Sequence, residues 1–277
     1  MHARSRRIVR VGPSRVSVLA RMSDSWRWVG DLRGEELARV LRFLPPGSTV
    51  LDFGAGSGQQ ARRLSELGFR VAAVDVESSP YLAQSVFPVH TYDGRSLPFA
   101  DRCFDVVMSS NVMEHVDDLP SALRELRRIL KPDGVMLHVL PSSSWRLWTT
   151  GAEFIAAPRN MIRGMRRAPY GKWGWMSPPW WTLAQLTWLV RPFLFRPHGE
   201  RGNALTELWR FSRGAWRRQF EANGWVVEDV VPLRIWYTGE TLVGPVMPIS
   251  VRTRVAARLG SATILYVLRP GAPRDAT

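Results

Sequence analysis

The chain has 277 residues, enough to bury one complete α/β core together with an inserted elaboration. Its one cysteine, Cys103, excludes internal disulfides and cysteine-cluster metal sites, and no run of about 18 to 20 apolar residues predicts a membrane-spanning helix. The formal net charge is +14, and all but two of the 38 basic residues are arginines, a skew that GC-rich codon usage alone produces.

Residues 1–25 are basic and precede the first predicted helix. Up to Met22 the segment has no acidic residue, and its arginines are Arg4, Arg6, Arg7, Arg10, Arg15 and Arg21. Because it lacks the apolar core of a signal peptide, we expect a disordered leader, with a transit peptide as the alternative. A folded domain is expected over residues 26–277, in the cytoplasm, with membrane association as a further option.

Helices and strands alternate along the first half of the folded part. A helix at 33–44 ends at Pro45-Pro46-Gly47 and leads into the first strand. The pattern then predicts strand 49–53, helix 57–67, strand 70–75, helix 79–84, strand 104–110, helix 118–130 and strand 134–140. A helix at 206–223 and strands at 225–232 and 262–269 follow a long insertion. This order predicts an α/β fold.

Three glycines, Gly54, Gly56 and Gly58, follow the first predicted strand, and Asp52 lies two residues ahead of them. Glycine tolerates positive φ and lets a ligand lie against bare backbone, while the next helix presents its electropositive N-terminus. The spacing G-x-G-x-G differs from the G-x-G-x-x-G fingerprint of dinucleotide sites. The loop predicts a nucleotide-like cofactor site, and the alternative is a tight strand-to-helix turn.

Two further acids stand at defined places in this pattern. Asp75 ends the second predicted strand, where a carboxylate can accept hydrogen bonds from both hydroxyls of a ribose. Taken alone it would also suit a helix N-cap, because Ser78-Ser79-Pro80 follows it. Asp93 precedes Gly94, a pair that is also typical of an ordinary Asx turn.

In this order, the segments resemble the motifs of class I S-adenosylmethionine (SAM) dependent methyltransferases, most closely the broad type 11 group. The similarity continues through residues 92–99, through 103–116 around the fourth strand, and through a helix stop at 130–134. It covers roughly residues 35–144, and again 206–230 and 262–270. The resemblance implies a doubly wound, Rossmann-like, seven-stranded mixed sheet whose last strand is antiparallel, with SAM as the cofactor.

The resemblance also implies which residues contact the cofactor. Asp75 would bind the ribose, and Asp93 with Gly94 would bind the adenine amino group. The full set of implied cofactor residues is Asp52, Gly54, Gly56, Gly58, Asp75, Asp93, Gly94, Ser109 and Asn111.

Residues 141–205 form an insertion much longer than a simple link between the fifth strand and the next helix. We expect a helical cap over the carboxyl ends of the strands, where open α/β sheets bind ligands. Most tryptophans lie here, together with Arg163, Arg166 and Arg167. Such a surface suits an anionic membrane or an apolar substrate, and the alternative is tryptophans that pack onto the core beside solvated arginines.

The resemblance implies methyl transfer from SAM but does not identify the acceptor; our leading hypothesis is a small-molecule or lipid-like acceptor, and we favour oxygen as the acceptor atom. A general base would come from His115, or from His198 and Glu200 at the end of the cap. His115 beside a helix start has a structural role as its alternative. No metal-ligand set occurs at a recognisable spacing, so we expect metal-free transfer.

Two other functions stay open. Basic and aromatic surfaces also hold single-stranded RNA, so an RNA methyltransferase is one alternative, although no RNA-binding module is recognisable and nucleic acid is not the expected partner. The other is a membrane-peripheral interaction protein of the same fold that has lost turnover. The intact glycine and acidic positions argue against that second alternative.

Overall fold

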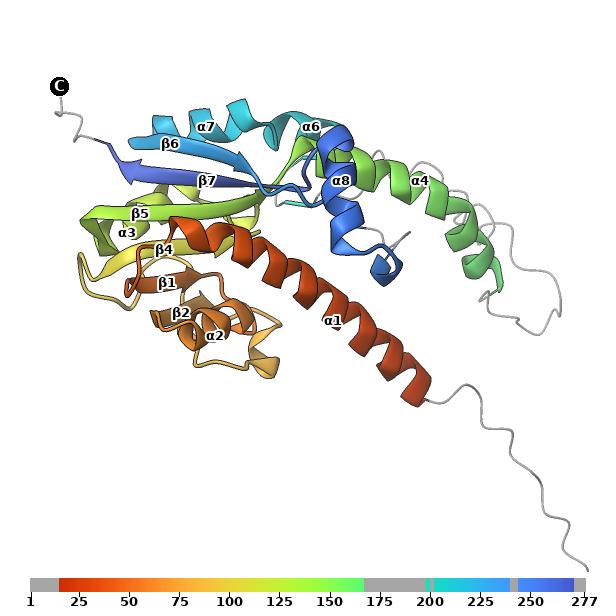
Figure 1. Ribbon diagram of the computed structural model, residues 1–277, viewed down its shortest axis with the longest axis horizontal. Helices are drawn as coiled ribbons and strands as arrows, with labels where there is room; N and C mark the ends of the chain where they lie inside the picture. Colours follow the sequence, from red (N-terminus) through yellow and green to blue (C-terminus); the bar gives the residue numbers. More distant parts are fainter. Residues whose placement is uncertain (1–14, 167–197, 200–201, 240–243, 272–277) are drawn as a thin grey trace, which may run out of the picture.

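The computed structural model describes residues 15–166, 198–199, 202–239 and 244–271. Its centre is a seven-stranded sheet in the order β3-β2-β1-β4-β5-β7-β6, in which β7 runs antiparallel to both of its neighbours (Figure 1). The strands are β1 (Thr49–Phe53), β2 (Arg70–Val76), β3 (His90–Tyr92), β4 (Phe104–Ser110), β5 (Leu130–Pro141), β6 (Trp225–Pro232) and β7 (Thr263–Pro270). This topology confirms the predicted mixed sheet with an antiparallel last strand.

Helices and short 3₁₀ turns connect the strands. The α-helices are α1 (Arg15–Val40), α2 (Gln59–Glu66), α3 (Leu119–Ile129), α4 (Ser143–Arg166), α6 (Ala204–Arg210), α7 (Arg213–Ala222) and α8 (Ile249–Leu259). The 3₁₀ turns are η1 (Leu41–Phe43), η2 (Leu82–Gln84), η3 (Met113–His115) and η4 (Gly244–Val246). In the described part of the chain, no helix combines the length and the hydropathy needed to cross a bilayer.

Alternate residues of the central strands face opposite sides of the sheet, and each side has its own core. On one side, Leu51 and Phe53 of β1 share a cluster with Leu126 of α3 and Phe220 of α7. On the other side, Val50 lies in a cluster with residues of α1 and α2. Helices therefore cover both faces of the sheet, as a doubly wound fold requires.

The first helix is longer than the sequence pattern indicated. α1 begins at Arg15, whereas the prediction placed a helix at 33–44. No proline interrupts residues 15–40, so each residue can add one backbone hydrogen bond to the growing helix. The structure places residues 15–25 in α1 rather than in the predicted disordered leader, and residues 1–14 lie outside the described part.

Other element boundaries also differ from the predictions. The helix predicted at 79–84 is only the turn η2. The Val86 N–H donates a hydrogen bond to the Ser57 carbonyl (2.8 Å), which holds this part of the chain near the start of α2. The helix predicted at 206–223 is divided, since Ser212 caps a new helix by accepting from the Ala215 N–H. β5 already begins at Leu130, and β3 and α8 had no predicted counterpart.

A buried carboxylate attaches α1 to the sheet. Glu36 accepts hydrogen bonds from Arg33 (2.6 Å), from the Tyr237 hydroxyl (3.0 Å) and from the Thr263 hydroxyl at the start of β7. Its side chain is only 1% exposed. Because Tyr237 and Thr263 come from two distant segments, this carboxylate sets how α1 lies against the pocket described below.

We expect Glu36→Ala to lower the free energy of unfolding by about 3 kcal/mol, because its removal leaves buried donors without an acceptor. Glu35→Ala is the matched control: Glu35 lies on the same helix but forms a partly exposed ion pair with Arg39, for which we expect less than about 1 kcal/mol. Urea unfolding followed by circular dichroism measures both. Equal losses in the two variants would contradict this role of Glu36.

Candidate active site

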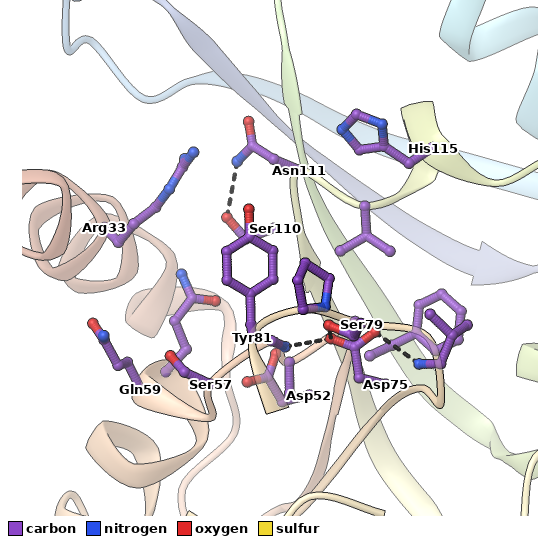
Figure 2. Close-up of a pocket in the computed structure, with 18 of the residues that line it drawn as sticks. Arg33, Asp52, Ser57, Gln59, Asp75, Ser79, Tyr81, Ser110, Asn111 and His115 are labelled. Carbon is purple, nitrogen blue, oxygen red and sulfur yellow. Dashed lines mark hydrogen bonds between the residues drawn. The ribbon is translucent and has the colours of Figure 1, made fainter. Parts of the chain in front are cut away.

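A pocket of about 530 Å³ opens at the carboxyl ends of β1, β2 and β4, where open α/β sheets bind ligands (Figure 2). α1 closes one side of it through Val29, Gly30 and Arg33. Its remaining walls come from the glycine loop, from the segment after β2 and from the turn after β4. The volume lies within the range of small-molecule and cofactor sites.

The glycine loop is held against β2 by backbone hydrogen bonds. The N–H groups of Gly54 and Ala55 both donate to the Val74 carbonyl, at 2.9 and 3.0 Å. Gly54 has φ +72°, and a Cβ there would lie 2.4 Å from Val112. No side chain larger than hydrogen fits at this position, so Gly54 allows the β1 loop and the turn after β4 to approach each other.

Gly56 and Gly58 have different places in the same loop. Gly56 lines the pocket, whereas Gly58 has φ +76° as the N-cap residue of α2 and is not among the lining residues. The sequence predicted both as cofactor-binding. The structure places Gly56 at the pocket wall and Gly58 at the start of α2.

Asp75 connects the end of β2 to the glycine loop and to the segment that follows it. Its carboxylate accepts from the N–H groups of Gly56 and Val76, both at 2.7 Å, and from the Ser79 hydroxyl at 3.1 Å (Figure 2). A carboxylate offers about four lone pairs, so these bonds leave capacity for a ligand hydroxyl. Asp75 caps no described helix, because the N-cap of η2 is Tyr81.

Asp52 is buried at the floor of the pocket. Its Oδ2 atom has no hydrogen-bond partner within the described residues. Burial raises the pKa of this carboxyl to about 7, and the nearby charge of Asp75 acts in the same direction. A buried acceptor without a partner suits a cationic ligand, and SAM carries a sulfonium and an ammonium group.

Asp93 and Gly94 line an adjoining pocket of about 730 Å³. The two pockets share Val76, Tyr92, His115 and Val116. Asp93 Oδ1 accepts from the N–H groups of Arg95 and Ser96, at 2.8 and 2.9 Å, which lowers the pKa of Asp93. These are the bonds of an Asx turn, and they leave the carboxylate exposed beside the main pocket.

Ser109 points away from the pocket. Its hydroxyl is buried and lies 2.7 Å from Nδ1 of His138 on β5. Asn111 does line the pocket, with φ +56°, and its amide donates to the Ser110 hydroxyl at 3.1 Å. Ser109, which was predicted to bind the cofactor, is not among the residues that line the pocket, whereas Ser110 is, because strand alternation turns Ser110 toward the pocket.

The pocket also includes residues that the sequence reasoning missed. Ser110 could have been found from the alternation along β4, since Ser109 and Ser110 must face opposite sides. Arg33, Gln59 and Tyr81 had no such local signal, because the fold brings them to the pocket from α1, α2 and the segment after β2.

Two of the predicted catalytic histidines meet beside the cofactor pocket. The rings of His115 and His198 have centroids 5.2 Å apart, and Nε2 of each lies within 4 Å of Glu114 Oε1. Burial lowers the pKa of His198 to about 4, and the charges of His115, Arg146 and Arg33 contribute. Glu200 lies outside the described residues, and Glu114 had not been predicted as a site residue.

His198 is held in place by another buried carboxylate. Glu207 Oε1 accepts from the N–H groups of His198 and Gly199, at 2.7 and 2.9 Å, and Glu207 Oε2 lies 3.1 Å from Nε of Arg146. A Cβ on Gly199 would lie 2.7 Å from the Glu114 carbonyl oxygen. The absence of a side chain at Gly199 therefore lets this turn reach Glu114.

Only part of the predicted cap over residues 141–205 can be described. α4 forms its first section, consistent with a helical insertion after β5. Residues 167–197 and 200–201 lie outside the described part, and so do the side chains of Arg163, Arg166 and Arg167. The expected basic, tryptophan-rich surface therefore stays a prediction.

Comparison with known proteins identifies a family. A family model described as a methyltransferase domain matches residues 25–230. A malonyl-[acyl-carrier protein] O-methyltransferase from Serratia marcescens is 38% identical over 96 residues, covering 33% of this chain and 38% of that protein. A ubiquinone biosynthesis O-methyltransferase from Rhodopseudomonas palustris is 28% identical over 180 residues, covering 60% and 63%. The chain thus spans less than two thirds of either relative.

Among solved structures, a putative methyltransferase from Haloferax volcanii, in complex with a methyltransferase activator, is similar with a TM-score of 0.50. It covers 90% of this chain and 95% of that protein at 18% identity. At this level of identity the similarity supports the fold alone.

We expect Asp75→Ala to weaken SAM binding by on the order of 2–3 kcal/mol, because the carboxylate both accepts from a ligand hydroxyl and holds the Gly56 N–H. Asp133→Ala, an exposed acid outside the pocket, serves as the control. Calorimetric titration with SAM compares the two. Equal affinity in both variants, with the fold intact, would remove Asp75 from the binding site.

SAM affinity should depend on pH through Asp52. The pKa of about 7 means that the carboxyl becomes neutral as the pH falls below this value, and a neutral group no longer attracts a cation. We expect SAM binding to weaken between pH 8 and pH 6, by up to roughly tenfold per unit below pH 7. Asp52→Asn should bind weakly at every pH. A pH-independent affinity in the unmodified chain would contradict the assignment.

Proposed function

This chain belongs to the class I SAM-dependent methyltransferase family, and we propose that it transfers a methyl group from SAM to an oxygen atom of a small-molecule or lipid-like acceptor. The observation that carries the proposal is the pair of imidazoles, His115 and His198, beside the pocket that fits the cofactor. Two relatives are named as O-methyltransferases, one of them in ubiquinone biosynthesis, which supports oxygen and a lipid-like acceptor.

The residues present fit SAM. The glycine loop offers bare backbone at Gly54 and Gly56, Asp75 offers a carboxylate with about one spare lone pair, and Asp52 offers a buried acceptor without a partner within the described residues. Asp93 is exposed in the adjoining pocket, which shares Tyr92 and Val76 with the main pocket. A ligand that extends from the main pocket into the adjoining one would therefore contact Asp93. The bound cofactor would supply an activated methyl group on its sulfonium.

The chain's own part in the reaction is positioning and proton handling. The walls of the pocket hold donor and acceptor in line and exclude water, which can account for much of the rate. His198 is neutral at physiological pH because burial lowers its pKa, so Nε2 can accept the proton of an acceptor hydroxyl. Glu207 keeps that imidazole in position through the backbone N–H groups of His198 and Gly199.

We expect His198→Ala to lower turnover about 10²–10⁴-fold while SAM affinity stays the same, because His198 is not among the residues that line the cofactor pocket. The assay follows S-adenosylhomocysteine release with hydroxylated phenols and quinone precursors as acceptors. His90→Ala changes an exposed histidine on β3 and is the control. Unchanged turnover in His198→Ala would refute the acceptor-side role.

For a lipid-like acceptor, we propose that the protein works at the cytoplasmic surface of an anionic membrane. The net charge of +14 favours such a surface. Figure 1 shows α4 extending beyond the sheet, and its side chains Leu147, Ile155 and Ile162 are exposed at helical spacing. Apolar residues on an exposed helix suit insertion at a bilayer interface.

Ile155→Glu should reduce flotation with vesicles that contain phosphatidylglycerol, since it places a negative charge in the exposed apolar stripe of α4. Leu67→Glu makes the same change at an exposed leucine after α2 and should float like the unmodified chain. Binding should also weaken as salt rises. If the unmodified chain does not float at low salt, the membrane proposal fails while methyl transfer stays untouched.

A further inference from the structure

Three ligand-type side chains converge at the end of η3. Glu114 and His115 are neighbours in this turn, and His198 comes from the distant segment before α6. Nε2 of His115 lies 3.9 Å and Nε2 of His198 lies 3.8 Å from the same carboxylate oxygen, Oε1 of Glu114. All three ligand atoms lie within 4.8 Å of one another.

We propose that Glu114, His115 and His198 form a binding site for a divalent transition-metal ion, with zinc as the best match. Two imidazoles and one carboxylate are a ligand set that zinc uses in catalytic sites, where a fourth position stays open. Ligand atoms about 2.0–2.2 Å from a tetrahedral ion stand roughly 3.4 Å apart. The two separations from Glu114 Oε1 need to shorten by about half an ångström, and all three ligand atoms, which lie within 4.8 Å of one another, can approach by side-chain rotation.

The burial of Glu114 is a second, independent observation that points to a cation. Its side chain is 0% exposed, and neither carboxylate oxygen has a hydrogen-bond partner in the described part of the chain. A buried carboxylate without a partner is strongly unfavourable unless a cation or a proton compensates it. Oε1 faces both imidazoles, so an ion between the three groups would provide that compensation.

The arginines near this cluster already have partners of their own. Arg33 pairs with Glu36 at 2.6 Å, and Arg146 lies 3.1 Å from Glu207. Arg33 also acts electrostatically on Glu114, but within the described residues neither guanidinium donates a hydrogen bond to the Glu114 carboxylate. Within the described residues both carboxylate oxygens of Glu114 therefore lack a hydrogen-bond donor, while Oε1 faces the imidazoles of His115 and His198, an arrangement that suits a divalent cation.

An ion could reach the site from solvent, and one side of the three-residue cluster is open. The side chains of His115 and His198 are 41% and 34% exposed, whereas Glu114 lies behind them. His115 also lines the cofactor pocket, so the open side of the cluster is next to the place where a methyl acceptor must lie. An ion at this position would bind and orient an acceptor oxygen, and Nε2 of His198 would then hold the ion instead of accepting a proton; this role rests on the proposed function, but ion binding itself does not.

This site departs from the metal-free transfer that the sequence predicted. Metal sites are recognised in sequences by short, regular ligand spacing. Here the third ligand arrives from a distant segment, held by the bonds of Glu207 to the His198-Gly199 turn. No local spacing could have indicated it.

The test is a titration of the full chain, freed of metal by a chelator, with Co²⁺ and then with Zn²⁺. We expect intense visible absorption bands of four-coordinate Co²⁺ at a stoichiometry of one, displaced by Zn²⁺, with proton release measured by calorimetry in two buffers. His198→Ala and Glu114→Gln should each weaken binding at least about tenfold, whereas His90→Ala should bind like the unmodified chain.

His115→Ala changes a partly exposed ring and keeps the test decisive if Glu114→Gln does not fold. The same Co²⁺ affinity in His198→Ala, His115→Ala and the unmodified chain would overturn the proposal, as would only the weak spectrum of hexaaqua Co²⁺. The assay of S-adenosylhomocysteine release on the same samples separates the two ideas. Metal binding without methyl transfer would refute the proposed function alone, and methyl transfer without metal binding would refute this site alone.

Discussion

The attachment of the glycine loop to β2 is the constraint on which the cofactor pocket depends. β1 and β2 are parallel neighbours, so both strands end at the same edge of the sheet. The Val74 carbonyl and the Asp75 carboxylate hold three successive backbone N–H groups of the loop, from Gly54 to Gly56. Asp75 thus both holds the glycine loop and lines the pocket. For this reason an acid at the end of this strand is a strong sequence indicator of the cofactor site.

Buried charge organises the other side of the site. Glu36, Glu207 and Glu114 are all buried carboxylates, but their surroundings differ. Glu36 and Glu207 accept from several donors and fix α1 and the His198 turn respectively. Glu114 has no such donor within the described residues. Glu36 and Glu207 therefore stabilise the structure. Glu114 instead has an unpartnered carboxylate oxygen, among the described residues, that faces the two histidines.

The sequence predicted six of the seven strands and five of the residues that line the cofactor pocket, because these features rest on local patterns. Five residues lie at the ends of strands or just after them, where the strand period and the glycine spacing are visible in the sequence. All five line the pocket: Asp52, Gly54, Gly56, Asp75 and Asn111. The motif locates the end of β4 but does not show which of its two serines faces the pocket, so the prediction named Ser109 whereas Ser110 lines it. Arg33 and Glu114 were missed because tertiary contacts, rather than spacing, bring them into place. The helix at 79–84 failed for the same reason, since one hydrogen bond to Ser57 outweighs weak local propensity.

A residue whose burial destabilises the fold is a candidate for a functional role. Burying a carboxylate without a partner is unfavourable by several kcal/mol, and an apolar residue of similar size at position 114 would avoid that cost. Burial raises the pKa of Glu114 to about 8, so the group is near neutrality in the absence of a cation and becomes an anion when one binds. Such a group couples cation binding to proton release. Gly199 and Glu207 hold His198 close to the Glu114 carboxylate. The unfavourable burial of Glu114 and the histidine that would help to bind a compensating cation therefore lie at the same place, beside the cofactor pocket.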